Sequence, residues 1–341
     1  MRTIGIDLGT TNCLAAVWQN GESVLIPDSS GEYLTPSFVS VDGDRIYVGK
    51  TAKERMIAHP DETASVFKRY MGTDKQFSLG GRLFRPEELS AFLLKKMKED
   101  AEEFLQEEVG EAIISVPAYF NDKARAATKH AGELAGLRVE RIINEPSAAA
   151  LACQNIEQRE DATILVFDFG GGTLDVSLVE CFDNVVQIEA VSGDNHLGGS
   201  DFDSVIAKYF CEKQNLLWDS LDEKLRAVII KAAERCKMEL TTAKDAVMRV
   251  RYEEQSWDLS LTRQDVVHIG AEIFRRMEKS VKRVLLDGKV SPKELTEVVL
   301  VGGSCKMEIV RQYLSYILEG RKIEMCDPDW MMRGAWCCRR D

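Results

Sequence analysis

The stretch Ile4-Gly-Ile-Asp-Leu-Gly-Thr-Thr-Asn12 recurs in altered form at Leu165-Val-Phe-Asp-Phe-Gly-Gly-Gly-Thr173. Each copy is typical of an apolar strand with a carboxylate at its end, a glycine-containing turn and a second strand, over 13–18 and 174–179. Glycine permits close approach of the backbone, and turn N–H groups can bind phosphate oxygens. A single Asp-Gly pair most often marks only a hairpin turn. Two copies, each with a threonine, favour a pair of loops that bind one polyphosphate.

The two aspartates of this repeat predict a metal ion. Asp7 and Asp168 repel a phosphate unless a cation lies between them. Mg²⁺ suits this role, because it keeps several waters and is typically held by one or two carboxylates together with substrate phosphates. The hydroxyl groups of Thr10, Thr11 and Thr173 are further candidate phosphate donors.

Length and composition indicate a soluble two-lobed protein of 341 residues, with lobe I over 1–157 and lobe II over 158–341. We expect the segment after about 327 to return to lobe I. The formal charge of −12 argues against nucleic acid or an anionic membrane as the main partner. No run of about 18 apolar residues occurs, so we expect a cytoplasmic protein without a membrane span. Nine cysteines without a C-x-x-C pair favour core residues over a zinc site or disulfides.

Periodicity predicts an α/β protein with mixed sheets and helices on their faces. Strands are expected at 3–8, 13–18, 23–26, 37–41, 45–48, 112–116, 139–143, 163–168, 173–180, 185–191 and 297–301, with a strand pair over 246–261. Helices are expected at 86–107, 122–135, 145–153, 201–214, 222–240 and 263–286. The first five strands are predicted to form one meander with turns at Asn20-Gly21 and Asp42-Gly43.

Two further patterns concern phosphate and nucleoside recognition. Gly49-Lys50-Thr51 lacks an upstream glycine at the P-loop spacing, so we interpret it as a helix start. Glu234, Lys237 and Thr241 recur on one face of a predicted helix, where they form either a ribose and purine site or only a surface ion pair between the first two. Gly302-Gly303 follows a buried strand, which is where α/β folds place ligands.

Six segments together carry a family resemblance. They are the first repeat, Val116-Pro-Ala-Tyr-Phe-Asn-Asp122, Ile143-Asn-Glu-Pro-Ser-Ala-Ala-Ala150, Phe167-Asp-Phe-Gly-Gly-Gly-Thr-Leu-Asp175, His196-Leu-Gly-Gly199 and Leu300-Val-Gly-Gly-Ser304. The chain resembles, over almost its whole length, the nucleotide-binding (ATPase) domain of DnaK-type heat shock protein 70 chaperones. Asp100-Ala-Glu-Glu-Phe-Leu-Gln106 is more similar to the HscC-like branch.

The resemblance implies an actin-like ATPase fold of two lobes, each with a duplicated mixed β-sheet flanked by helices (a ribonuclease H-like motif). It implies ATP or ADP as the nucleotide with Mg²⁺, and K⁺ is a further candidate ion. Matching positions suggest catalytic roles for Lys68, Glu145, Asp168 and Thr173, and metal binding through Asp7, Asp168 and Asp175. The nucleotide-binding positions implied are Gly9, Thr10, Thr11, Asn12, Gly170, Gly171, Gly172, Thr173, Gly198, Gly199, Glu234, Lys237, Thr241, Gly302, Gly303, Ser304 and Lys306.

The resemblance also implies partners. Pro117 and Arg125 match positions that relay the nucleotide state, while Arg141 and Asn144 match part of a docking surface for a J-domain co-chaperone. A nucleotide exchange factor is a second expected partner. We expect no peptide-binding domain in this chain, so peptide clients would need a domain outside it.

The sequence departs from the family pattern at two positions and in its C-terminal segment, which is about one residue short of the pattern after Asp327-Pro-Asp329. Lys306 stands where the family usually has arginine, and an ammonium stacks less well on a base. Ser200 stands where glutamate is common, which removes a charge near the cleft.

Three functions therefore compete. A Mg²⁺-dependent ATPase of chaperone type would hydrolyse ATP slowly by in-line water attack coupled to lobe closure. A non-catalytic nucleotide-sensing module is suggested by Lys306 and the altered C-terminal segment. A small-molecule kinase, such as a sugar kinase, is compatible with the two Asp-x-Gly loops.

Overall fold

The computed structural model describes residues 2–152, 161–182, 185–321 and 323–325, and these residues form two compact units. Unit 1 comprises the chain up to Val166 together with Ser177–Val191. Unit 2 comprises Phe167–Val176 and Ser192–Met325. The predicted lobe boundary near 157 and the predicted return of the chain after 327 lie outside the described residues, so both stay predictions.

The main sheet of unit 1 has the strand order β11-β10-β1-β2-β3, with the short β4 paired to β2. Its strands are β1 (Arg2–Asp7), β2 (Asn12–Gln19), β3 (Glu22–Leu25), β4 (Thr35–Pro36), β10 (Val109–Val116) and β11 (Arg138–Asn144). β1 runs antiparallel to β2 and parallel to β10, and β10 runs parallel to β11. The predicted turn at Asn20-Gly21 is confirmed, because both residues have positive φ as a type I′ hairpin requires.

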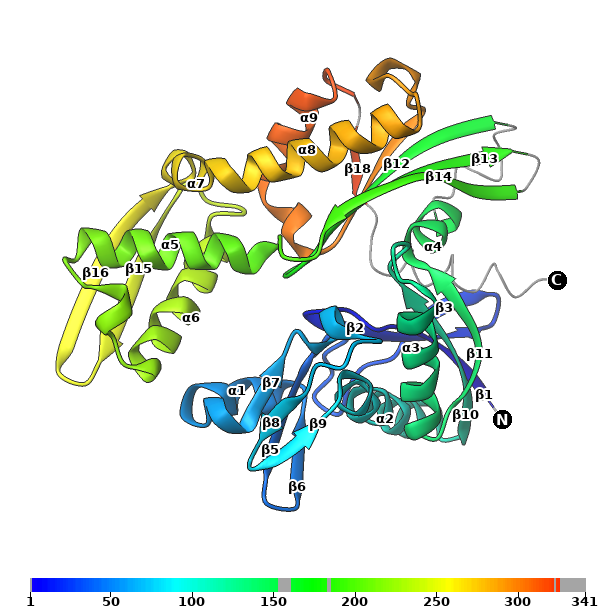
Figure 1. The fold of residues 1–341 in the computed structure, drawn as a ribbon, viewed down its shortest axis with the longest axis horizontal. Helices are drawn as coiled ribbons and strands as arrows, with labels where there is room; N and C mark the ends of the chain where they lie inside the picture. Colours follow the sequence, from blue (N-terminus) through cyan, green and yellow to red (C-terminus); the bar gives the residue numbers. More distant parts are fainter. Residues whose placement is uncertain (1, 153–160, 183–184, 322, 326–341) are drawn as a thin grey trace. The chain divides into compact units, whose positions relative to one another are not determined.

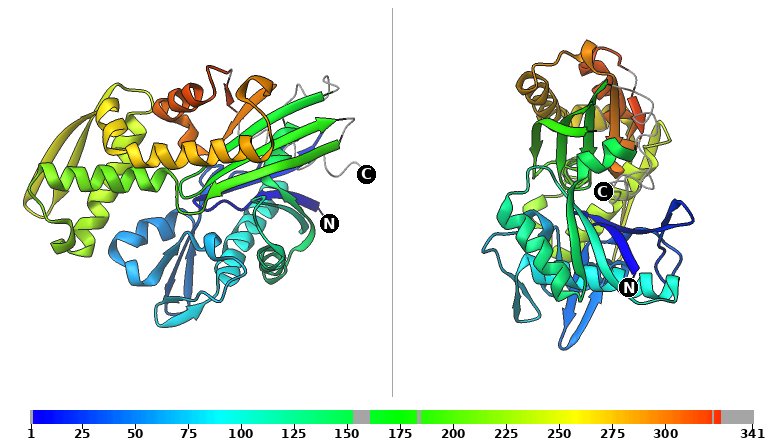
Figure 2. Two further views of the ribbon diagram at one scale, coloured as in Figure 1. Left: turned by 45° about the horizontal axis from the view of Figure 1, so that its top comes forward. Right: turned by 90° about the vertical axis from the view of Figure 1, so that its right-hand side faces the viewer.

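Three helices of unit 1 follow the predicted order. They are α2 (Pro86–Leu105), α3 (Asp122–Leu134) and α4 (Glu145–Ala152). α2 and α3 lie side by side against the main sheet (Figures 1 and 2). The face of α2 that carries Leu89, Leu93 and Met97 is buried, as the apolar spacing predicts. These contacts belong to one large core cluster of unit 1, and two small clusters of buried residues are separate from it.

The predicted single meander is wrong, because its last two strands belong to a second sheet. β5 (Phe38–Asp42) lies between β6 (Arg45–Val48) and β7 (Thr63–Ser65) in a three-stranded sheet. The β5–β6 turn lies at Gly43-Asp44, one residue later than predicted. The strands β7, β8 (Phe77–Leu79) and β9 (Arg82–Phe84) have three residues each, which is too short to show alternation in sequence.

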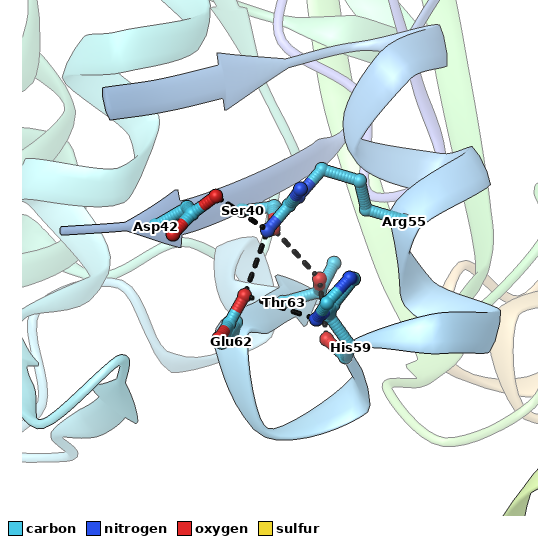
Figure 3. A network of polar contacts seen from close by, with 6 residues as sticks. All are labelled: Ser40, Asp42, Arg55, His59, Glu62 and Thr63. Atoms are coloured by element: carbon cyan, nitrogen blue, oxygen red, sulfur yellow. Dashed lines mark hydrogen bonds and ion pairs between the residues drawn. The ribbon is translucent and has the colours of Figure 1, made fainter.

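A polar network around Arg55 joins the elements of this small sheet (Figure 3). Helix α1 (Lys50–Ala58) begins at Lys50, which confirms the predicted helix start. From α1, Arg55 donates through Nε to Ser40 Oγ at 3.0 Å and through Nη2 to Glu62 Oε2 at 2.7 Å. Its guanidinium also lies 4.5 Å from the ring centre of Tyr47. Arg55 therefore links β5, β6 and the 3₁₀ turn η1 (Pro60–Glu62) through one side chain.

We expect Arg55→Met to loosen the small sheet of unit 1. The substitution keeps much of the apolar stem but removes two hydrogen bonds and the stack on Tyr47, a loss of about 2–3 kcal/mol of local opening free energy. Amide hydrogen exchange of β5 and β7 measures this quantity. Arg275→Met is the matched control, because its ion pair with Glu272 is 71% and 64% exposed and contributes less than about 1 kcal/mol. Equal exchange in both variants would contradict the structural role of Arg55.

The second main sheet repeats the plan of the first. Its strand order is β14-β13-β12-β17-β18, which matches β3-β2-β1-β10-β11 element by element. The strands are β12 (Asp161–Phe169), β13 (Leu174–Phe182), β14 (Val185–Asp194), β17 (Glu297–Val301) and β18 (Ile323–Met325). Every residue of β17 is buried, as predicted for a central parallel strand. The duplication inferred from the two Asp-x-Gly segments is therefore present in the fold.

The residues of β12, β13 and β14 are divided between the two units, whereas the helices and the hairpin that follow belong to unit 2. These elements are α5 (Gly199–Lys213), α6 (Glu223–Glu239), β15 (Asp245–Tyr252), β16 (Gln255–Thr262), α7 (Arg263–Ile269), α8 (Ala271–Asp287) and α9 (Glu308–Ile317). The β15–β16 hairpin packs on α6, and α5 lies beside α6 (Figures 1 and 2).

The predicted single helix over 263–286 is wrong, because Gly270 separates α7 from α8. A Cβ at Gly270 would lie 2.8 Å from the Val266 carbonyl oxygen and 3.0 Å from the ring of Phe202. The close approach of Phe202 on α5 therefore favours glycine at this position, which periodicity does not reveal.

Two composition-based expectations can be compared with the described residues. Cys13, Cys181, Cys211, Cys236 and Cys305 are buried and free, which confirms that they are core residues. The other four cysteines lie outside the described residues. Within the part of the chain that the structure describes, no helix is long and apolar enough to cross a membrane.

Candidate functional site

In unit 1, three predicted site residues converge at the carboxyl end of the parallel strands. Asp7 ends β1, and Glu145 follows directly after β11 as the first residue of α4. Lys68 lies in the 3₁₀ turn η2 (Phe67–Tyr70). Its Nζ lies 2.9 Å from Glu145 Oε1, and the two side chains are only 6% and 9% exposed. Folding thus brings together two residues 77 positions apart in the sequence, which form a buried ion pair.

The charges of this cluster depend on one another. Burial alone lowers the pKa of Lys68, but attraction to Glu145 and Asp7 outweighs burial and raises that pKa. Burial raises the pKa of Glu145, Lys68 acts against that rise, and Asp7 adds to it. Buried ion pairs rarely improve stability over apolar packing, so this one is better explained by chemistry than by folding.

The backbone before Lys68 is strained. Val66 has φ 53° and ψ 18°, a left-handed conformation that a β-branched residue adopts only at a cost of about 1–3 kcal/mol. This conformation directly precedes the turn that carries Lys68. Strain of this kind is concentrated at functional sites, which agrees with a positioned lysine.

Asp7 is held by a residue that sequence reasoning missed. Ser115 Oγ, which is buried on β10, donates to Asp7 Oδ1 at 2.9 Å. Ser115 is the register partner of Asp7 in the parallel β1–β10 pair. The contact could be predicted only from the register of β1 and β10, and the sequence alone does not give that register.

The first glycine turn is closely packed on itself and on Ser37. A Cβ at Gly9 would lie 1.9 Å from the Asn12 carbonyl oxygen, so only glycine fits there. Ser37 Oγ donates to the Gly9 carbonyl at 2.7 Å, and Ser37 N donates to the Thr11 carbonyl at 2.8 Å. The predicted phosphate residues Thr10, Thr11 and Asn12 remain partly or fully exposed. Sequence reasoning missed Ser37, which lies 28 positions from Gly9.

In unit 2, the structure brings the second glycine turn together with two other predicted glycine segments. The Gly170 carbonyl accepts from Gly199 N at 3.0 Å and from Ser304 Oγ at 2.8 Å. The Gly171 carbonyl accepts from Ser200 N at 2.8 Å. Segments 170–173, 198–200 and 302–304 therefore form one cluster, and their role as nucleotide-binding residues stays a prediction.

Gly302 packs this cluster closely against Asp168 and Phe169. It has φ +89°, and a Cβ there would lie 2.5 Å from the Phe169 carbonyl oxygen and 2.8 Å from Asp168 Oδ1. Its neighbour Gly303 has open space at the same position. Thr173 accepts the Gly170 N–H through its carbonyl at 3.0 Å, and Asp175 is buried on β13.

The helix face predicted from Glu234, Lys237 and Thr241 is present only in part. Lys237 Nζ lies 2.8 Å from Asp203 Oδ1 on α5 and 2.9 Å from the Gly199 carbonyl, so Lys237 joins α6 to the glycine cluster. Glu234 is partly exposed one turn earlier. Thr241 does not continue this face, because α6 ends at Glu239 and the Thr241 hydroxyl donates to the Met238 carbonyl. Lys306 lies exposed after Ser304. Sequence reasoning missed Asp203.

The residues expected to relay signals lie together in unit 1. Arg125 donates through Nη2 to Asn144 Oδ1 at 2.6 Å and through Nε to the Phe120 carbonyl at 2.9 Å. Asn144 directly precedes Glu145 in the chain. An implied relay residue therefore contacts an implied docking residue next to the buried ion pair.

The donor set fits a hydrated magnesium ion better than a fully protein-bound metal. Within the described ranges, no three His, Cys, Asp or Glu side chains group closely enough to hold a metal ion. Mg²⁺ typically needs only one or two carboxylates, because waters and phosphates supply its other ligands. Asp7 belongs to unit 1 and Asp168 to unit 2, so the metal set of Asp7, Asp168 and Asp175 stays a prediction.

Comparison with known protein families identifies the family of this chain. A family model described as Hsp70 protein matches residues 3–335 of the chain. The chain belongs to the Hsp70 family. Its mixed α/β architecture with repeated sheets fits the actin-like ATPase fold of that family. Hsp70 family members are ATPases that bind ATP or ADP with Mg²⁺ and work with co-chaperones, and the chain is a chaperone ATPase module of this general kind.

Proposed function

We propose that this chain binds MgATP through its two Asp-x-Gly turns and hydrolyses it slowly by in-line attack of water. The observation that carries the proposal is the buried Lys68–Glu145 pair beside Asp7. A fixed cation at that place would stabilise negative charge that develops on a transferring phosphoryl group.

Each residue of the cluster has a distinct proposed role. Lys68 binds the terminal phosphate and stabilises its transition-state charge. Glu145 orients the attacking water and accepts a hydrogen bond from it. Asp7 and Asp168 would hold Mg²⁺ through its water shell, and the bound ion would neutralise phosphate charge. Thr173 adds a hydroxyl donor, while Lys237 and Glu234 would contact the nucleoside. Coupling of turnover to closure of the two lobes is part of the same proposal.

We also propose partners and a branch. Asp100–Gln106 supports an HscC-like relative. Arg141 and Asn144 would dock a J-domain co-chaperone, and the contact between Asn144 and Arg125 would carry its effect toward Glu145. A nucleotide exchange factor would complete the cycle.

Single-turnover phosphate release with and without Mg²⁺ tests the main proposal. We expect slow turnover that stops when Mg²⁺ is chelated. Tight ATP binding without turnover would instead establish a nucleotide-sensing module. ADP formation that requires an added sugar would establish a kinase.

The pH profile of turnover tests the role of Glu145. The pKa of Glu145 is raised above its ordinary value of 4.5 by burial and by Asp7, so the water-orienting carboxylate is lost as pH falls, beginning above pH 4.5. The pKa of Lys68 is raised above 10.5, so the lysine stays charged throughout the neutral range. We expect the turnover rate of the wild type to fall at acidic pH. Glu145→Gln should remove this fall and should also lower the turnover rate at neutral pH. An identical fall in Glu145→Gln would show that another group titrates.

A further inference from the structure

Two serines far apart in the chain make the same contact in the two copies of the repeat. Ser37 Oγ donates to the Gly9 carbonyl at 2.7 Å, and Ser304 Oγ donates to the Gly170 carbonyl at 2.8 Å. Gly9 and Gly170 occupy the same place, two residues after the aspartate. Ser37 and Ser304 are only 2% and 7% exposed. Both glycine turns are therefore held by a buried hydroxyl group from outside the repeat.

A hydrogen bond that orients a carbonyl group also orients the N–H group of the next residue. The peptide unit is planar and trans, so a C=O and the N–H that follows it point in opposite directions. With the Gly9 carbonyl turned to Ser37, the Thr10 N–H points away from Ser37. With the Gly170 carbonyl turned to Ser304, the Gly171 N–H points away from Ser304. Turn N–H groups held in this way form an anion-binding site.

The Cys13 thiol lies beside the contact between Ser37 and Gly9. The Cys13 Sγ lies 3.3 Å from Ser37 Oγ, and either group can donate in that contact. Burial raises the pKa of Cys13 to about 11, so this thiol keeps its proton and can donate to Ser37 Oγ. The thiol can also donate to the Gly9 carbonyl at 3.9 Å, so Cys13 supports the same turn. Ser37 N holds the Thr11 carbonyl at 2.8 Å, which anchors the same turn a second time.

We propose that Ser37 and Ser304 are matched positioning residues that aim the Thr10 and Gly171 N–H groups at the phosphates of the bound nucleotide. The proposal rests on the proposed function and deepens it. It gives Ser304, which the family resemblance implies to be a nucleotide-binding residue, a role in orienting the phosphate-binding turn. It adds Ser37 as a residue of the site.

Calorimetric titration with MgADP and with adenosine separates the two roles, because adenosine carries no phosphate. We expect Ser37→Ala and Ser304→Ala each to weaken MgADP binding by about tenfold, the effect of one lost hydrogen bond. Adenosine affinity should stay within about twofold of the wild type. Ser90→Ala is the matched control, because Ser90 is an equally buried serine that donates to the Pro86 carbonyl at 2.8 Å within α2. It should change neither affinity.

Three outcomes would overturn parts of the proposal. An unchanged ratio of MgADP to adenosine affinity in both alanine variants would reject it. If Ser304→Ala weakens the binding of MgADP and adenosine equally, Ser304 contacts the adenosine rather than orienting the phosphate-binding turn. Failure of the wild type to bind MgADP would reject the proposed function and the nucleotide half of this proposal.

A second measurement tests the positioning half without nucleotide. We expect amide exchange over 9–12 in Ser37→Ala and over 170–173 in Ser304→Ala to be at least about fivefold faster than in the wild type. Unchanged exchange would show that neither serine holds its turn.

Discussion

We expect Lys68→Met to lower the rate of ATP hydrolysis by about 10²–10³-fold while MgADP binding is largely kept. Removing one preorganised charge from a water-excluded site typically has an effect of this size, because the charge acts most strongly on the transition state. Lys68 Nζ is buried and fixed 2.9 Å from Glu145, so water cannot replace it readily. Single-turnover phosphate release, together with calorimetric titration of MgADP, measures the two quantities separately.

Lys237→Met is the matched control for this experiment. Lys237 is a partly buried lysine of the candidate site, and its ion pair with Asp203 has side chains 13% and 10% exposed. Both substitutions leave a carboxylate without its lysine, so they share a stability cost of about 3–5 kcal/mol. We expect Lys237→Met to weaken nucleotide binding more than it slows the chemical step. If both variants lose binding and rate alike, Lys68 has no specific catalytic role.

The second large effect concerns stability. We expect Gly302→Ala to lower the unfolding free energy of unit 2 by about 2–5 kcal/mol, because it combines a left-handed φ with overpacking. The new Cβ would lie 2.5 Å from the Phe169 carbonyl oxygen and 2.8 Å from Asp168 Oδ1. Either the turn or the strand that carries Asp168 must move. Amide exchange over β12 and β17 reports the change locally.

Gly303→Ala provides the neighbouring comparison. Its Cβ would meet open space, and we expect stability within about 1 kcal/mol of the wild type. Equal losses in the two variants would show that chain entropy, rather than contact with Asp168, governs this turn. A stable Gly302→Ala protein that still binds MgADP with full affinity would contradict the close packing of β17 against the Asp168 strand.

Much of the fold could be predicted from local pattern. The apolar alternation and the Asp-x-Gly repeat predicted both main sheets and their duplication, and the strand order confirms it. The stripe of Leu89, Leu93 and Met97 predicted which face of α2 is buried. These predictions succeed because each depends on the hydrophobic periodicity within single helices or strands. Strands of three residues and the break at Gly270 escaped prediction, because they depend on neighbours that periodicity does not include.

The types of residue needed for phosphate chemistry are present in the sequence, but their partners come from distant segments. The sequence alone determined two Asp-x-Gly turns and a Glu-Pro helix start, and the family resemblance marked Lys68. Only the tertiary structure decided that Lys68 pairs with Glu145, that Ser115 holds Asp7, and that Ser37 and Ser304 hold the two turns. Such pairings depend on strand register and chain return over 28 to 134 positions, and no local preference encodes either.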